Sequence, residues 1–165
     1  QGLELVDPSY FRTDRRFEQL MRVRRPTKEY GTVGAIALDQ NGNLCAGTST
    51  GGMTNKKWGR IGDSPVIGAG TYADNLTCGV SSTGHGEFFI RGVAAYDVAA
   101  KMKYQKKTVE EAASEVIREL DEMGGSGGLV AMDGEGYVSM PFSSEGMYRG
   151  YITETGEMII KIFKD

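Results

Sequence analysis

The stretch "RRPTKEYGTVGAIALDQNGN", residues 24–43, places a charged segment directly before a strand-like apolar run. Pro26 disfavours helix at the residue before it, and the segment up to Gly31 is mostly polar. From Thr32, "TVGAIALD" predicts a mostly buried strand. The Asn-Gly pair in "QNGN" is a turn signal, so "LCAGTST" is the returning strand of a hairpin. We therefore expect a connector that ends at a Gly-Thr pair, with the threonine opening a strand.

Length and composition limit the class of protein. The 165 residues suit one domain with a real core, and the mixed charges sum to −3. This balance argues against nucleic acid or a membrane surface as the main partner, and no apolar run approaches the roughly 20 residues of a membrane span. Cys45 and Cys78 lie far apart outside any CxxC pattern, so we interpret them as free thiols. A cytoplasmic location is expected, although the start at Gln1 is compatible with a removed upstream signal.

Glycine is frequent, at 24 residues, and gathers in clusters such as "STGGMTN", "VIGAGTYADN", "STGHGE" and "MGGSGG". Strand-like or helical runs separate these clusters. They indicate places where the backbone turns sharply or approaches a ligand, and turn glycines remain the simpler interpretation for any one of them.

Helical signals occur in three places. A helix within residues 1–25 is expected to be capped by Thr13, with Phe17, Leu20 and Met21 on its apolar face. A second helix is predicted from Glu87 to about Lys103. A third begins at the capping box formed by Thr108 and Glu111 and ends at "MGGSGG".

The remaining runs predict strands. "PVIGAG" and "CGVSST" are expected as two short strands, and two hairpins follow the helices, "LVAMD"–"YVSMPF" and "MYRGYIT"–"EMIIKIF". Tight turns imply antiparallel pairing, so the fold class is α+β with two helices on one face of the sheet. The long apolar runs in "VGAIAL" and "EMIIKIF" predict strands buried on both faces, which requires a further layer or another chain.

Thr32 draws attention because a threonine hydroxyl needs a base to act as a nucleophile. His85 is the only histidine, and no GxSxG or Cys/His signature accompanies it. If the chain were cut between Gly31 and Thr32, the new α-amino group, with a pKa of roughly 7.7 to 8, would supply the base. A glycine before the cut offers a bond that is easily strained and attacked. β-propensity alone is the other explanation for a threonine at this place.

Further motifs carry a resemblance. "GTVGAIALD", "GNLCAGTSTGGMTNKKWGRIGDSPVIGAGTYADN" and "SSTGHGE" resemble the plant-type asparaginase and isoaspartyl aminopeptidase family of N-terminal-nucleophile hydrolases. The likeness covers Thr32 to about Arg149, and "GLELVDPSYFRTDRRFEQLMRVRR" is similar to the end of the family's first subunit. The resemblance implies residues 1–31 as the α-subunit end and autocleavage linker, and 32–165 as the catalytic β-subunit portion. It also implies an αββα sandwich, of which this chain supplies roughly half.

By the resemblance, Thr32 is the nucleophile, and self-cleavage falls between Gly31 and Thr32. Thr50, in "TSTGG", is similar to the hydroxyl that orients the Thr32 oxygen. Thr83 and Gly84, in "SSTGHG", are similar to an oxyanion hole made by a side-chain hydroxyl and a backbone N–H.

The same resemblance implies that Arg60 and Asp63, in "GRIGD", clamp the substrate. A guanidinium can hold an α-carboxylate and a carboxylate can hold an α-ammonium, although a local surface ion pair would use the same two residues. Gly86 is expected to let substrate approach the backbone. His85 is interpreted as a pocket-wall or helix-start residue rather than a base, and no metal site is expected from one histidine and two distant cysteines.

The implied reaction is hydrolysis of the side-chain amide of L-asparagine and of isoaspartyl (β-aspartyl) dipeptides through a threonyl acyl-enzyme. The implied partners are the remaining α-subunit portion and an (αβ)2 assembly, with no nucleic acid and no membrane. No cofactor is expected for the chemistry; the family's structural sodium would need a loop outside this chain. Two alternatives stay open, a glycosylasparaginase-type amidase and an inactive, unprocessed structural fragment.

Overall fold

The computed structural model describes residues 5–22, 31–56 and 59–164. Its elements in chain order are η1 (Pro8–Phe11), α1 (Asp14–Arg22), β1 (Thr32–Leu38), β2 (Leu44–Thr50), β3 (Thr71–Ala73), β4 (Cys78–Gly84), α2 (Gly86–Gly92), α3 (Ala94–Gln105), α4 (Val109–Glu122), β5 (Gly127–Asp133), β6 (Val138–Ser139), β7 (Arg149–Ile152) and β8 (Met158–Lys161). This mixture of helices and antiparallel strands is an α+β fold. No helix among these residues is long and apolar enough to span a bilayer.

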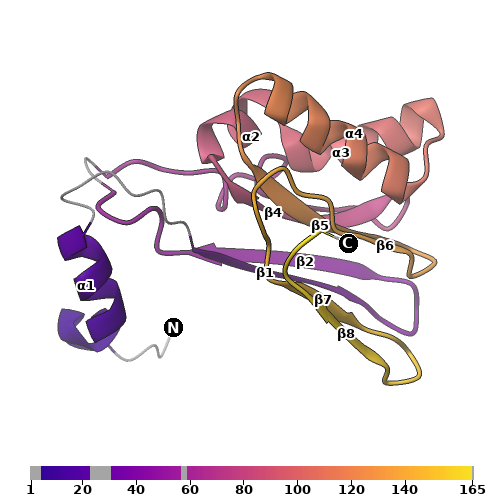
Figure 1. Ribbon diagram of the computed structural model, residues 1–165. Coiled ribbons are helices and arrows are strands. Elements are labelled where there is room, and N and C mark those ends of the chain that lie inside the picture. Colours follow the sequence, from indigo (N-terminus) through magenta and orange to yellow (C-terminus); the bar gives the residue numbers. More distant parts are fainter. Residues whose placement is uncertain (1–4, 23–30, 57–58, 165) are drawn as a thin grey trace.

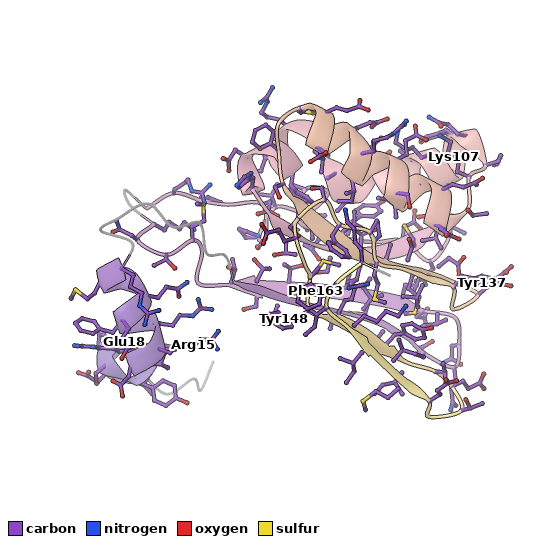
Figure 2. All side chains as sticks on the ribbon, in the orientation of Figure 1. Arg15, Glu18, Lys107, Tyr137, Tyr148 and Phe163 are labelled. Carbon is purple, nitrogen blue, oxygen red and sulfur yellow. The ribbon has the colours of Figure 1, made fainter. Side chains whose placement is uncertain are left out.

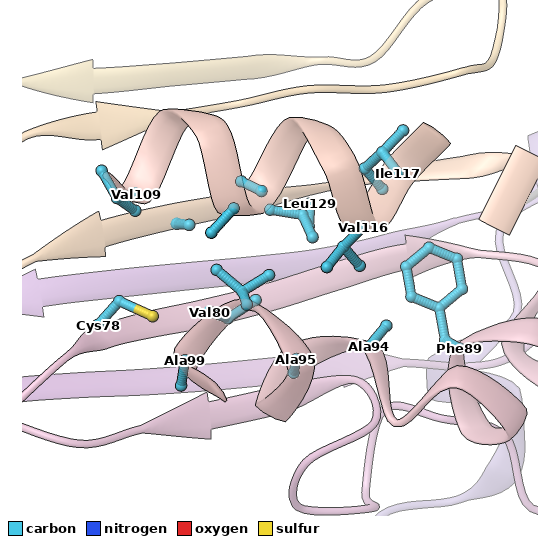
Figure 3. Close-up of a cluster of buried hydrophobic side chains, with 14 of the residues drawn as sticks. Cys78, Val80, Phe89, Ala94, Ala95, Ala99, Val109, Val116, Ile117 and Leu129 are labelled. Carbon is cyan, nitrogen blue, oxygen red and sulfur yellow. The ribbon is translucent and has the colours of Figure 1, made fainter. Parts of the chain in front are cut away.

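The core lies between the helices and a four-stranded antiparallel sheet of order β3-β4-β5-β6. α3 and α4 cover one face of this sheet (Figure 1). Phe89, Val116 and Leu129 come from a helix, a second helix and a strand, and they meet in one cluster of almost fully buried side chains (Figure 3). Burying such side chains stabilises the fold by roughly 1.5–3 kcal/mol each.

The β1–β2 hairpin forms a second layer against the other face of that sheet, and small residues allow the two layers to touch. A Cβ atom added at Gly34 would lie 1.9 Å from Ser81 Oγ, and one added at Gly79 would lie 2.7 Å from Ile36 Cγ2. The Thr48 and Ser81 hydroxyls are hydrogen-bonded at 2.6 Å across the same interface. Gly34 of β1 faces Ser81 of β4, and Ile36 faces Gly79, so the two strands cross in opposite directions. The start of β1 therefore lies over the end of β4.

Several sequence expectations are confirmed. Thr13 accepts the Arg16 N–H at 3.3 Å and so caps α1, and the Thr108–Glu111 capping box is present at the start of α4. The Asn-Gly turn joins β1 to β2 through Gly42, which has φ +80°, and Gly124, with φ +90°, follows α4.

Two expected elements are wrong. The single helix predicted from Glu87 to about Lys103 is divided at Val93, whose φ of +48° separates α2 from α3. "PVIGAG" is not a strand but a compact turn, with β3 beginning only after it. The two errors have one cause: the turn supplies the Gly68 and Ala69 carbonyls that accept N–H groups from the first turn of α3. These two carbonyls from a distant turn cap the start of α3, so a new helix begins there although the apolar helical pattern of the sequence continues without a break.

The apolar strands predicted to need a further layer are exposed on one face in this chain. Val33 on β1 is 70% exposed and Ile160 on β8 is 72% exposed. β7 and β8 form a separate two-stranded ribbon. Among the described residues nothing covers these apolar side chains, and a covering layer stays a prediction.

The contact between the two sheets can be tested by filling it. Gly34→Ala should destabilise the full-length protein by about 1–3 kcal/mol, because its methyl group collides with Ser81 Oγ, which Thr48 holds in place. Thermal unfolding measures this as a lower melting temperature. The matched control is Gly47→Ala on β2, where an added Cβ meets nothing within 4 Å. Equal melting temperatures for the two variants would show that the sheets are not in close contact.

Candidate active site

Two threonine hydroxyls form the centre of the site. Thr32 opens β1 and pairs in register with Thr50 at the end of β2. The Thr32 hydroxyl donates to Thr50 Oγ1 at 3.4 Å, and Thr50 donates its own proton to the Gly31 carbonyl at 2.8 Å. Thr50 Oγ1 also accepts the Gly52 N–H at 2.9 Å, which fixes its orientation. The Thr50 hydroxyl therefore bridges the side chain and the preceding carbonyl of the Gly31–Thr32 bond.

The end of β4 lies beside this pair. Gly84 has φ +144°, and a Cβ there would lie 2.4 Å from the Ser126 carbonyl oxygen. Its partner in the ladder is Gly127, where an added Cβ would lie 2.3 Å from the Thr83 carbonyl oxygen. Only glycine fits this facing pair. The backbone after Thr83 consequently turns sharply into α2, as expected of a strand that ends at a site.

A cavity of ≈ 770 Å³ opens on one side of Thr32. Thr32, Thr50, Thr83, Gly84 and Ser126 are among the residues that line it. The rim comes from distant parts of the chain: Arg15, Arg16 and Gln19 of α1, and Ser144, Gly146, Met147 and Tyr148 before β7. Figure 2 labels Arg15 and Tyr148, which come from these two sides.

A second, much smaller hollow of ≈ 20 Å³ also borders Thr32, and the residues of the predicted clamp line it. Arg60, Asp63 and Gly86 line it, and Thr32, Thr50 and Gly84 line both hollows. The structure thus brings all the predicted site residues around one threonine.

Asp63 is a buried carboxyl with an unused oxygen. It is 7% exposed, and Oδ2 has no hydrogen-bond partner among the described residues. Gly86 makes room for it, since a Cβ there would lie 2.5 Å from Asp63 Oδ1. Burial raises the pKa of Asp63, and the nearby Arg60 charge opposes that shift. A cationic ligand group in this hollow would satisfy the free oxygen and lower the pKa again.

Arg60 does not form an ion pair with Asp63. Its Nη1 lies 3.5 Å from Glu87 Oε2, and both side chains remain substantially exposed. A pair of this kind contributes little, roughly 0–1 kcal/mol. The guanidinium can therefore exchange Glu87 for an incoming carboxylate at low cost.

His85 is the N-cap residue directly before α2, as expected of a helix-start residue. Its ring Nδ1 accepts the Ser126 backbone N–H at 3.1 Å. The backbone N–H of His85 donates to the Ser126 carbonyl at 2.9 Å. It ties the start of α2 to the "GGSGG" loop and is not among the residues that line either hollow.

Cys45 and Cys78 are free, as predicted, and burial raises the pKa of the Cys78 thiol to about 12, so it is inert at neutral pH. Within the described ranges no group of three or more His, Cys, Asp or Glu side chains could hold a metal ion.

Sequence reasoning missed several members of the cavity wall. The "GGSGG" loop with Ser126 was interpreted mainly as a helix stop, with a secondary positioning role implied by the family resemblance; the pairing of β4 with β5 brings Ser126 beside Gly84. The rim residues of α1 lie in the stretch that is similar to the end of the family's first subunit, but neither they nor the residues before β7 were assigned a role. Only the tertiary structure brings them to Thr32.

The α+β fold brings three features together: the Thr32–Thr50 hydroxyl pair, the glycines at the end of β4, and the hollow lined by Asp63 and Arg60. These are the parts expected of a threonine-nucleophile site. Comparison with known proteins gives the family. Residues 1–162 match the family described as Asparaginase. The chain belongs to the asparaginase family.

Individual relatives agree. The isoaspartyl peptidase of Escherichia coli (strain K12) is 51% identical over 172 residues, covering 94% of this chain and 54% of the relative. The isoaspartyl peptidase of Salmonella typhimurium is 51% identical over the same length, covering 55% of that protein. The isoaspartyl peptidase/L-asparaginase of Danio rerio is 46% identical over 115 residues, 69% of this chain. The chain spans about half the length of the bacterial relatives.

The unpaired oxygen of Asp63 should lower the stability of the fold while it remains available to bind a cationic ligand group. A carboxyl whose pKa is raised in the folded state destabilises the fold once it ionises, and the cost grows as the pH rises from 3.8, the ordinary value, through the folded pKa. Asp63→Asn should therefore raise the melting temperature at pH 7 and lose that advantage below pH 3.8. Thermal scans across this range measure the effect. Asp121→Asn, at an exposed position on α4, is the control and should change little. A lower melting temperature for Asp63→Asn at pH 7 would contradict the argument.

Proposed function

We propose that this chain is part of a self-cleaving threonine hydrolase that acts on the side-chain amide of L-asparagine and on isoaspartyl dipeptides. The observation that carries the proposal is the hydrogen-bonded sequence Thr32 Oγ1, Thr50 Oγ1 and Gly31 carbonyl, placed where the two hollows meet. The printed names of the relatives, isoaspartyl peptidase and L-asparaginase, supply the substrate class.

In the proposed hydrolysis, Arg60 holds the substrate α-carboxylate and Asp63 holds its α-ammonium. The Thr32 hydroxyl adds to the amide carbon, and its proton passes to the free amine of Thr32. The Thr83 hydroxyl and the Gly84 N–H stabilise the oxyanion, and removing one such donor typically costs about 2.7–4 kcal/mol. The C–N bond breaks with that proton delivered to the leaving nitrogen, and water then releases aspartate and restores the hydroxyl.

In the proposed self-cleavage, the same hydroxyl adds to the Gly31 carbonyl carbon. The Gly31–Thr32 C–N bond breaks, and the nitrogen takes the proton to become the amine that later acts as base. The ester left between Gly31 and Thr32 is hydrolysed by water. Thr50 supports the first step, because its hydrogen bond at 2.8 Å polarises the carbonyl that is attacked.

The remaining parts of the proposal concern the whole protein. We propose residues 1–31 as the α-subunit end and linker, and 32–165 as the β-subunit portion. A further α-subunit portion would complete an αββα sandwich within an (αβ)2 assembly. The exposed apolar side chains of β1 and β8 support a missing layer. A cytoplasmic location, supported by the two free thiols, belongs to the same proposal.

Removing one oxygen tests the proposed nucleophile. Thr32→Ala should stay a single chain and lose amidase activity, while the wild type splits between Gly31 and Thr32. Intact-mass measurement of the full-length protein, with L-asparagine and β-aspartyl dipeptide assays, follows both reactions. Thr155→Ala, in the exposed turn before β8, is the control and should behave as wild type. Cleavage or full activity in Thr32→Ala would refute the proposal.

The proposed clamp should affect binding rather than self-cleavage. Arg60→Ala should lower kcat/KM for L-asparagine by roughly 10- to 150-fold, corresponding to about 1.5–3 kcal/mol for hydrogen bonds to a charged group. The cut before Thr32 should continue. Arg91→Ala is the matched control, since this arginine of α2 lies over Phe88 and lines neither hollow. Loss of the cut in Arg60→Ala would count against the clamp role.

A further inference from the structure

An arginine of α1 lies against the glycine that precedes Thr32. A Cβ added at Gly31 would lie 2.7 Å from Arg16 Nη2, and the three nearest heavy atoms all belong to the Arg16 guanidinium. Arg16 Nη1 donates to Gln19 Oε1 at 2.6 Å. Gln19 is only 6% exposed, so this acceptor is fixed although Arg16 itself is largely exposed. The guanidinium is thus anchored on the helix and pressed against Gly31.

Arg16 and Gln19 line the cavity that also contains Thr32, Thr83 and Gly84. The other face of α1 is different: Arg22 pairs with Glu18 at 3.6 Å, and both side chains are exposed to solvent. α1 therefore places the anchored positive charge of Arg16 beside Gly31, the residue before Thr32. Surface ion pairing does not account for this contact.

We propose that Arg16, held by Gln19, is a positioning residue for the cut between Gly31 and Thr32. This inference rests on the proposed self-cleavage and adds to it a residue that no motif marks. Arg16 keeps Gly31 in place, so that its carbonyl stays on the Thr50 hydroxyl. Its charge also stabilises the negative charge that forms on the Gly31 carbonyl oxygen when Thr32 attacks.

The contact with the Arg16 guanidinium gives a reason for a glycine at position 31, because a side chain there would occupy the space of the guanidinium. Among the described residues, the atoms nearest to a methyl group at Gly31 belong to the end of a flexible arginine, Arg16. Gly31→Ala is therefore tolerated by the fold but displaces the guanidinium. The cost of Gly31→Ala should consequently depend on whether Arg16 is present.

The experiment follows the rate of cleavage of newly made full-length precursor by intact mass. Arg16→Ala should slow the cut about tenfold or more, the effect of losing one contact to a charged group. Gln19→Leu should slow it less, and added guanidinium ion should restore part of the rate to Arg16→Ala, while sodium chloride at equal ionic strength should not. Arg22→Ala is the matched control and should cut as wild type.

A double-mutant cycle separates the contact from a general structural role. Gly31→Ala should slow the cut in the wild-type background and have a much smaller effect in Arg16→Ala. Equal effects in both backgrounds, or wild-type cleavage in Arg16→Ala, would overturn the inference while leaving the hydrolase proposal intact. A wild-type precursor that never cuts, or a Thr32→Ala precursor that does, would overturn both. If Arg16→Ala does not fold, Arg16→Lys replaces it in the cycle and should cut at an intermediate rate.

Discussion

The close contact between the β1–β2 hairpin and β4 is the constraint on which the rest of the structure depends. Gly34 over Ser81 and Gly79 under Ile36 fix both the distance and the offset of the two layers. That offset places the first residue of β1 over the end of β4. A larger side chain at either glycine would separate the layers, and Thr32 would then lose its position beside Thr83. The packing of two sheets thus determines the geometry of the proposed chemistry.

Features of the site lower the stability of the fold, and the hydrophobic core compensates for this loss. Asp63 is buried with an unpaired oxygen, and the facing Gly84 and Gly127 give no side-chain packing at the end of the ladder. The cluster around Phe89, beneath α2, α3 and α4, lies next to this strained end and holds β4 and β5 together. Such local destabilisation is typical of places where a ligand is meant to supply the missing contacts. Here the free oxygen of Asp63 indicates the kind of ligand group that is missing.

The sequence predicted local features well and tertiary features poorly. The β1–β2 hairpin, the capping box at Thr108 and the glycine stop after α4 depend on neighbouring residues, so pattern reasoning found them. The break at Val93 depends on carbonyls from a distant turn, and periodicity cannot detect it. For the site, the motifs named the residues around Thr32, but the cavity rim from α1 comes from chain folding alone. Arg16 shows the difference, because nothing in its neighbourhood in the sequence marks it.

Thr32 lines both the larger and the smaller hollow. The smaller hollow offers charge complementary to an amino acid, and the larger one, across the same hydroxyl, offers space and exposed polar groups. In the proposed reaction, the α-carboxylate and α-ammonium of the substrate would meet Arg60 and Asp63 at the smaller hollow, and the leaving group would extend into the larger one. Because the larger hollow is open and ≈ 770 Å³ in size, it places little restriction on the leaving group. One fixed acyl side and one permissive leaving side would let ammonia and an amino acid depart from the same site.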